Sequence, residues 1–176
     1  MARDLIERAV MSFVERILVP VDFSDCARSA CASAVALAER TRASVDLLHV
    51  HDLGHAAWAW APLDVLAFDN GRALLGDAID ISHTLNRWVE ELERQSPVPI
   101  RGRIEHGDPL HAILEVARRD RYDLIVMGTH GRTGMSLLLL GNLTRNVMRR
   151  APCPVLTVPQ SAERETPAKR ASARLA

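Results

Sequence analysis

Three glycines at a fixed spacing are the residues of this chain best suited to surround a phosphate. In the stretch GTHGRTGMSLLLLGNLT, two residues separate Gly128 from Gly131, nine more follow, and Gly141 precedes Asn142. Such a loop can direct backbone N–H groups toward an anion, and a helix beginning near Asn142 would add the positive end of its dipole. The stretch matches neither the P-loop nor the dinucleotide-binding fingerprint, however. Glycines alone therefore favour a structural turn.

Polar residues at the ends of apolar runs are the second set of candidates. Asp22 ends the run RILVPVD, His51 ends SVDLLHVH, and His130 follows DLIVMGT. In an open α/β sheet, ligands bind beyond the carboxyl ends of the strands, where the strand order reverses. A carboxylate there can accept hydrogen bonds from a ligand, although for Asp22 alone a helix cap is the favoured interpretation.

The elements that must position these residues alternate between strands and helices. We predict strands at 16–22, 44–51, 98–107, 123–129 and 154–159, and helices within 24–41, 63–95, 107–120 and 141–152. Near-continuous Val, Ile and Leu runs are typical of strands covered on both faces, whereas the alternation in 98–107 indicates a place nearer an edge. In the last helix Leu143, Val147 and Met148 are predicted to face inward. The order of elements predicts an α/β fold with a mainly parallel sheet.

Composition excludes several function classes. Basic and acidic residues number 22 each, so the basic excess of a nucleic-acid-binding protein is missing, and no apolar run is long enough for a membrane span. Cys26, Cys31 and Cys153 form no CxxC pair, which favours a reducing, cytoplasmic setting.

Three segments lie outside the predicted domain core. Residues 1–13 lack the features of a signal peptide and form an N-terminal extension, with Met11 as an alternative start. Residues 160–176 lack apolar periodicity and are expected to be disordered. The long connection that contains Trp58 and Trp60 is a lid, a dimer contact or a segment packed back on the domain.

The blocks ILVPVDFSDCARSA, GDP and DLIVMGTHGRTGMSLLLLGNLTRNVMRRAPCPVLTV resemble the universal stress protein family over roughly residues 16–158. The resemblance implies a Rossmann-like domain at 14–159, with a five-stranded parallel sheet of order 3-2-1-4-5 and helices on both faces. It also implies a stress-response role and a homodimer, which we expect to form through Val155–Val158. One branch of the family binds ATP through G-x-x-G, nine residues and G-[ST], while the other branch lacks this motif.

This chain has the spacing of the ATP-binding branch, with Asn142 in place of Ser or Thr. By resemblance, the adenine side comprises Pro20, Val21, Asp22 and Val50, the ribose and phosphate region comprises Met127, Gly128, His130 and Gly131, and the outer phosphates meet Gly141, Asn142, Leu143 and Thr144. A lost hydrogen bond to a charged group costs about 1.5–3 kcal/mol, or ~10–100-fold in affinity. The Asn amide is itself a donor, but its oxygen would compete as an N-cap. Asn142→Ser should tighten binding if the missing hydroxyl is limiting.

These residues predict binding rather than catalysis. The expected ligand is ATP or ADP, with Mg²⁺ on the phosphates rather than on the protein, because His51, His106 and His130 with Asp52 and Asp108 lack a tight ligand spacing. We identify no catalytic residue, and the resemblance implies weak ATPase activity at most. The favoured function is a dimeric sensor or adaptor that binds nucleotide. The alternative is a stress protein without nucleotide that acts through dimerisation and protein contacts. An enzyme of the wider adenine-nucleotide α-hydrolase-like group would need a pyrophosphate-cleaving motif that is missing here.

Overall fold

One parallel sheet organises the chain. The computed structural model describes residues 14–51, 70–129 and 141–159. Its strands are β1 (Arg16–Pro20), β2 (Ser44–His51), β3 (Ile100–His106), β4 (Leu124–Gly128) and β5 (Val155–Val158), in the order β3-β2-β1-β4-β5. Every neighbouring pair is parallel. The predicted fold class and strand order are confirmed, and the alternating strand lies at an edge as expected.

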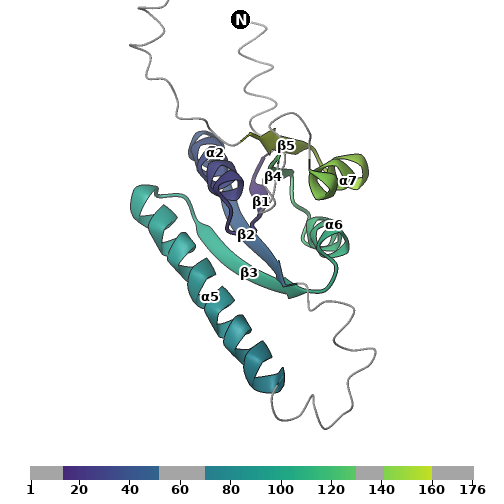
Figure 1. Cartoon of the computed structure of the whole chain (residues 1–176). Helices are drawn as coiled ribbons and strands as arrows, with labels where there is room; N and C mark the ends of the chain where they lie inside the picture. The colour runs from purple at the N-terminus through teal and green to yellow at the C-terminus, as the bar shows by residue number, and fades with distance from the viewer. Residues whose placement is uncertain (1–13, 52–69, 130–140, 160–176) are drawn as a thin grey trace, which may run out of the picture.

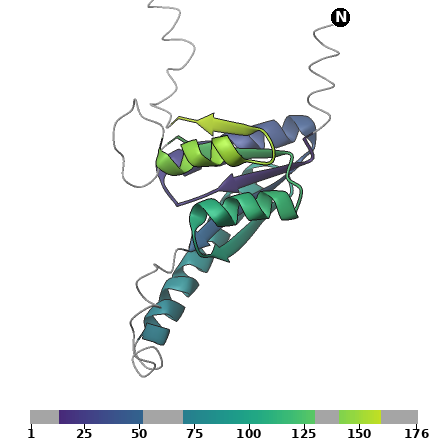
Figure 2. The ribbon, with the colours of Figure 1, turned by 90° about the vertical axis from the view of Figure 1, so that its right-hand side faces the viewer.

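Helices cover both faces of this sheet (Figure 1). The bounds are α2 (Asp25–Thr41), α5 (Asn70–Gln95), α6 (Pro109–Arg119) and α7 (Asn142–Arg150). Helices α2 and α5 pack on one face and α6 and α7 on the other, so the sheet separates two apolar clusters. The amino-terminal part of α5 extends past the sheet, as the rotated view also shows (Figure 2).

Local sequence signals explain where two of the helices begin. The Ser24 side chain accepts a hydrogen bond from the Ala27 N–H at 3.2 Å and caps α2. Asp108 caps α6 by accepting from the His111 N–H at 2.9 Å, and Pro109 occupies the first helical position. Proline suits that position because its missing N–H would have no partner there. Both starts agree with the sequence-based prediction.

A buried carboxylate departs from the apolar pattern of β2. Asp46 is only 5% exposed, accepts a hydrogen bond from the Tyr122 hydroxyl at 2.5 Å and pairs with Arg16 at 3.4 Å. The Arg16 guanidinium also lies over the Tyr122 ring, 4.6 Å from its centroid. Burial, together with the bond to Asp46, raises the pKa of Tyr122 to about 12. The network satisfies a charge that would otherwise be costly to bury.

The prediction for α7 was wrong at two positions. Val147 is fully buried, but Leu143 and Met148 are 38% and 46% exposed. The buried stripe of this nine-residue helix runs through Thr144 and Val147, one turn apart. At about 100° per residue, Leu143 and Met148 lie only about 40° outside the two edges of that stripe, yet both are exposed. Helical periodicity therefore suggested a wider inner face than α7 has.

Several predictions fall on residues beyond the described ones. They concern the extension at 1–13, the connection with Trp58 and Trp60, and the tail at 160–176. Among the helices that the structure describes, none combines the length and the apolar character that a membrane crossing requires.

Candidate functional site

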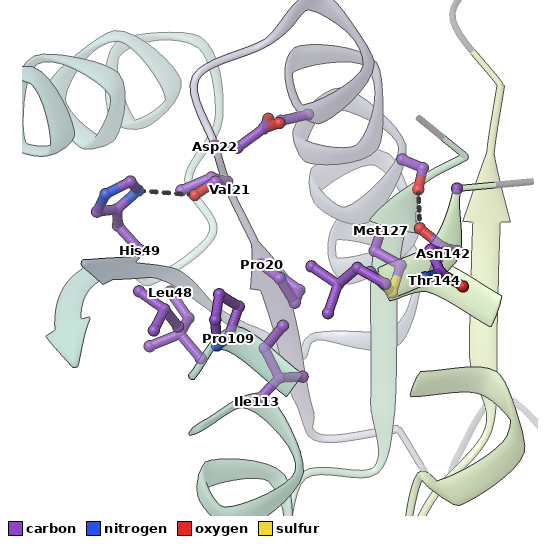
Figure 3. A pocket seen from close by; sticks show the side chains of 15 residues that line it. Pro20, Val21, Asp22, Leu48, His49, Pro109, Ile113, Met127, Asn142 and Thr144 are labelled. Atoms are coloured by element: carbon purple, nitrogen blue, oxygen red, sulfur yellow. Dashed lines mark hydrogen bonds between the residues drawn. The ribbon is translucent and has the colours of Figure 1, made fainter. Parts of the chain in front are cut away.

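A cavity of about 370 Å³ opens at the carboxyl ends of β1, β2 and β4 (Figure 3). It is bounded by the starts of α2 and α7 and the first turns of α6, where the strand order reverses between β1 and β4. The lining residues are Pro20, Val21, Asp22, Ala27, Leu48, His49, Val50, Pro109, Ile113, Met127, Gly128, Gly141, Asn142, Leu143 and Thr144. Small-molecule sites usually measure about 300–1,000 Å³, so this cavity is large enough for such a ligand.

Every predicted site residue that the structure describes lines this one cavity. His130 and Gly131 lie outside the described residues. Sequence reasoning missed five further lining residues, namely Ala27, Leu48, His49, Pro109 and Ile113. The GDP block already marked the start of α6, and the end of β3 brings that start to the edge of the sheet where the cavity lies, so Pro109 had a usable signal. The others depend on strand register and helix packing.

One half of the cavity is an apolar slot. Leu48 and Val50 share the face of β2 that is turned to α6, and both belong with Ile113 and Met127 to the cluster on that side of the sheet. Pro20 lines the slot at the end of β1, and Figure 3 shows its side chain with those of Leu48, Ile113 and Met127 around a common opening. A slot of this kind suits a flat apolar or aromatic group, whose polar edges would meet backbone N–H and C=O groups.

Asp22 supports the start of α2 rather than capping it. Its carboxylate accepts hydrogen bonds from the Ser24 N–H at 3.1 Å and from the Ser24 hydroxyl at 2.5 Å. Ser24 in turn is the N-cap residue of α2. The interpretation of Asp22 as the cap itself was therefore wrong by two residues, although the carboxylate does fix the turn that holds the cap.

An aromatic contact fixes the turn between β1 and α2 from the other face. Phe23 has a left-handed backbone, with φ of 64°, which is uncommon for a bulky residue. Its ring stacks on His49 at 4.6 Å and meets Trp88 of α5 edge-on at 5.5 Å. The His49 Nδ1 lies 2.9 Å from the Val21 carbonyl oxygen, and because a carbonyl only accepts, this nitrogen carries the proton. His49 therefore positions the Val21 backbone at the cavity wall.

Gly128 is required by packing at the end of β4. A Cβ atom added there would lie 2.8 Å from the Cβ of Cys26 and 3.0 Å from its carbonyl carbon. The carbonyl oxygen of Gly128 accepts a hydrogen bond from the buried Thr144 hydroxyl at 2.9 Å. Gly128 thus lies where α2, β4 and α7 meet. The hydrogen bond that the Thr144 hydroxyl can donate is made within the fold.

The start of α7 forms the polar end of the cavity. Gly141 is the N-cap residue and makes no side-chain cap, while its N–H bonds to the Thr129 carbonyl at 2.7 Å. The first-turn N–H groups of Asn142, Leu143 and Thr144 follow directly, and these donors have no partner within an α-helix. All three residues line the cavity, so the helix presents its positive end there.

Asn142 does not compete as an N-cap, contrary to expectation. It occupies the first helical position, after Gly141, and its Oδ1 accepts a hydrogen bond from Nη2 of Arg145 at 2.7 Å. The three-residue interval puts both side chains on the same side of the helix. Arg145 is a polar group beside the cavity that sequence reasoning missed, although the interval itself could have suggested the pair.

The histidines expected at the sheet edge are only partly brought together. His51 and His106 are paired in register across β2 and β3, and their rings are 5.9 Å apart. Asp52 and His130 lie outside the described residues. Within the part of the chain that the structure describes, no three His, Cys, Asp or Glu side chains are arranged to hold a metal ion.

Known proteins resemble the chain along most of its length. The sequence profile of the universal stress protein family matches residues 14–159. A universal stress protein of Methanocaldococcus jannaschii is 30% identical over 149 residues, which are 82% of this chain and 81% of that protein. The solved structure of universal stress protein UspA from Lactobacillus plantarum has a TM-score of 0.70 at 28% identity, covering 82% of this chain and 97% of its own.

Two more distant structures carry nucleotides. One is a universal stress protein in complex with cAMP, with a TM-score of 0.60 at 23% identity over 85% of this chain and 100% of its own. The other is a family protein of Arabidopsis thaliana with AMP bound, with a TM-score of 0.57 at 22% identity over 89% of this chain and 98% of its own. At these identities the likeness establishes the shared fold alone.

Proposed function

Because the chain belongs to the universal stress protein family, we propose that it binds ATP or ADP in the cavity at the carboxyl ends of β1, β2 and β4. The adenine lies in the apolar slot, and the phosphates extend toward the start of α7. The fold can hold adenine nucleotides, since two distant proteins that share it were solved with cAMP and AMP.

One observation carries this proposal. A single cavity joins an apolar slot, formed by residues such as Leu48 and Met127, to the uncapped first turn of α7. A planar base needs the first kind of surface, and a polyphosphate needs the second, because helix N-terminal N–H groups stabilise anions. One nucleotide can contact both surfaces only when they open into the same space. The glycine spacing and the family then favour a nucleotide over other ligands of mixed polarity.

We assign the bound nucleotide a sensing role with little turnover. Of the polar groups around the cavity, Asp22 binds Ser24, and Thr144 donates to Gly128. His49 directs its Nδ1 to the Val21 carbonyl. All three are thus engaged in the fold, which does not favour their use as a general base for an attacking water. Any Mg²⁺ would be held by the phosphates.

The test is direct. Purified protein is denatured, the supernatant is analysed for adenine nucleotide, and the thermal midpoint of nucleotide-free protein is measured with and without MgATP. The proposal predicts released nucleotide or a stabilisation that grows with ATP concentration, since a ligand that binds only the native state stabilises it. No nucleotide and no shift at millimolar ATP would refute it.

A second function is favoured by a specific observation. The most conspicuous residue of the glycine motif, Gly128, is already explained by its contact with Cys26, so its presence does not require a ligand. Asn142 also replaces the Ser or Thr of the ATP-binding motif. The second candidate is therefore a stress protein without nucleotide that acts through dimerisation and protein contacts. It predicts the negative result of the experiment above together with a dimer.

In both cases we propose a homodimer in a reducing, cytoplasmic setting. β5 is the last strand of the sheet and pairs only with β4 among the described strands, and Leu156 at its centre is 41% exposed. An apolar edge strand is a template for a second copy. The described cysteines are free thiols, with Cys26 and Cys31 buried, as suits a reducing compartment.

A further inference from the structure

The side chains of Asn142 and Arg145 form a pair beside the polar end of the cavity. Nη2 of Arg145 donates to Oδ1 of Asn142 at 2.7 Å. Asn142 lines the cavity, and both residues are exposed. The guanidinium is therefore held within one helical turn of the N–H groups proposed to meet the outer phosphates.

We propose that Arg145, anchored by Asn142, is a specificity-determining residue that makes the site select nucleoside di- and triphosphates over monophosphates. The proposal rests on the nucleotide site proposed above. It gives Asn142 two roles: its Oδ1 atom orients the Arg145 guanidinium, and its amide NH₂ group remains a donor. A positive side chain near a helix N-terminus is unfavourable for the helix itself. A bound polyanion would reverse that cost.

The chemistry of the two side chains supports this role. An arginine fork presents several N–H donors, so a guanidinium that gives one donor to Asn142 keeps others for phosphate oxygens. The missing Ser or Thr hydroxyl is one neutral donor, whereas Arg145 supplies a charged one. Charge-assisted hydrogen bonds to phosphate are roughly twice as strong as neutral ones. The Asn142–Arg145 pair would thus supply a charged donor in place of the missing Ser or Thr hydroxyl.

The geometry limits which phosphates Arg145 can reach. Gly128, proposed for the ribose and first phosphate, lies at the end of β4, and its carbonyl is already bonded to Thr144. Arg145 follows Thr144 on the outer side of α7 and does not itself line the cavity. In this proposal its guanidinium, held by Asn142 at the start of α7, meets the outer phosphates, which a monophosphate lacks.

The experiment measures dissociation constants of ATP, ADP and AMP by calorimetry for the wild type and Arg145→Gln. Hydrogen bonds to charged groups are worth about 10–100-fold in affinity, and exposure puts this one at the low end. We expect Arg145→Gln to weaken ATP binding about tenfold and AMP binding less than about twofold. Arg149→Gln is the matched control, because it removes the same charge from the exposed last turn of α7. It should leave both constants unchanged.

A double-mutant cycle tests the anchor. With Arg145 present, Asn142→Ser gains a hydroxyl but releases the guanidinium, so ATP binding should not tighten. With Arg145→Gln, the same substitution should tighten it. Equal tightening in both backgrounds would overturn the proposed coupling, and an unchanged ratio of ATP to AMP affinity in Arg145→Gln would overturn the selectivity. In either case bound AMP would show that the nucleotide site itself stands, whereas failure of all three nucleotides to bind would refute both proposals.

Discussion

Replacing Gly128 with alanine tests whether the first glycine of the phosphate motif is needed for the fold. The new methyl group would lie 2.8 Å from the Cβ of Cys26 and 3.1 Å from its carbonyl oxygen. Two of the three nearest atoms belong to backbone at the start of α2, so a change of rotamer cannot relieve the overlap. Gly128 is not among the glycines with positive φ. The cost of the methyl group is therefore steric.

The magnitude follows from the two contacts that must change. Overpacking a close-packed site costs about 1–3 kcal/mol. Separating β4 from its neighbours also strains the hydrogen bond from Thr144 to the Gly128 carbonyl, which is worth about 0.5–1.5 kcal/mol. We expect Gly128→Ala to lower the free energy of unfolding by roughly 2–4 kcal/mol. For a domain of this size the thermal midpoint should fall by roughly 5–15 °C.

The assay is urea denaturation followed by circular dichroism, with Gly102→Ala as the matched control. A Cβ at Gly102 would meet side-chain atoms of Leu85 at 3.0 Å and 3.1 Å and of Val89 at 3.4 Å, so the atoms that must shift by a few tenths of an ångström belong to side chains and not to the backbone. Gly102→Ala should stay within about 1 kcal/mol of the wild type. If Gly128→Ala were no less stable than Gly102→Ala, the packing argument would be refuted. Its confirmation would also show that Gly128 variants are destabilised, so that a loss of ligand binding in them could not be assigned to a lost ligand contact alone.

Two further predictions concern the buried network and the edge strand. Tyr122 is the one tyrosine of the chain, so phenolate absorbance reports on it alone. Its pKa of about 12 lies above the value of about 10 for an unfolded chain, so its contribution to stability is complete below about pH 10 and is lost as the pH rises toward 12. A phenolate midpoint near pH 10 in the folded protein would contradict this. On β5, Leu156→Glu should convert the proposed dimer to a monomer in light scattering, because a buried unpaired charge is costly; a wild-type monomer, or a variant that remains dimeric, would refute the interface.

Much of the fold could be predicted because its strands are short, continuous apolar runs separated by helical patterns. Leu18 and Ile125 are fully buried in such runs, and parallel strands covered on both faces produce this pattern. Helix starts at Ser24 and Asp108 were also predictable, since capping depends on residues within one turn. The cavity followed from topology, because the carboxyl ends of neighbouring parallel strands must meet at one edge.

The rest depended on partners distant in the sequence. In the sequence, Asp46 interrupts the apolar run of β2 without an evident reason. The structure supplies the reason, because the hydroxyl of Tyr122, 76 residues away, donates a hydrogen bond to the Asp46 carboxylate. The reason for Gly128 is the backbone of Cys26, which no motif encodes. Leu143 fits an inward helical pattern, yet the pattern does not say how much of α7 the sheet covers. These are properties of packing between elements rather than of any single element.

The most direct test of the central claim is calorimetric titration of nucleotide-free protein with MgATP, in the wild type and in Val50→Trp. Val50 lines the apolar slot, so an indole there should fill the space proposed for adenine. We predict saturable binding of one ATP per chain in the wild type, and its loss in a variant that keeps the wild-type circular dichroism spectrum. Absence of binding at millimolar MgATP, or equal affinity in Val50→Trp, would contradict a nucleotide site in this cavity.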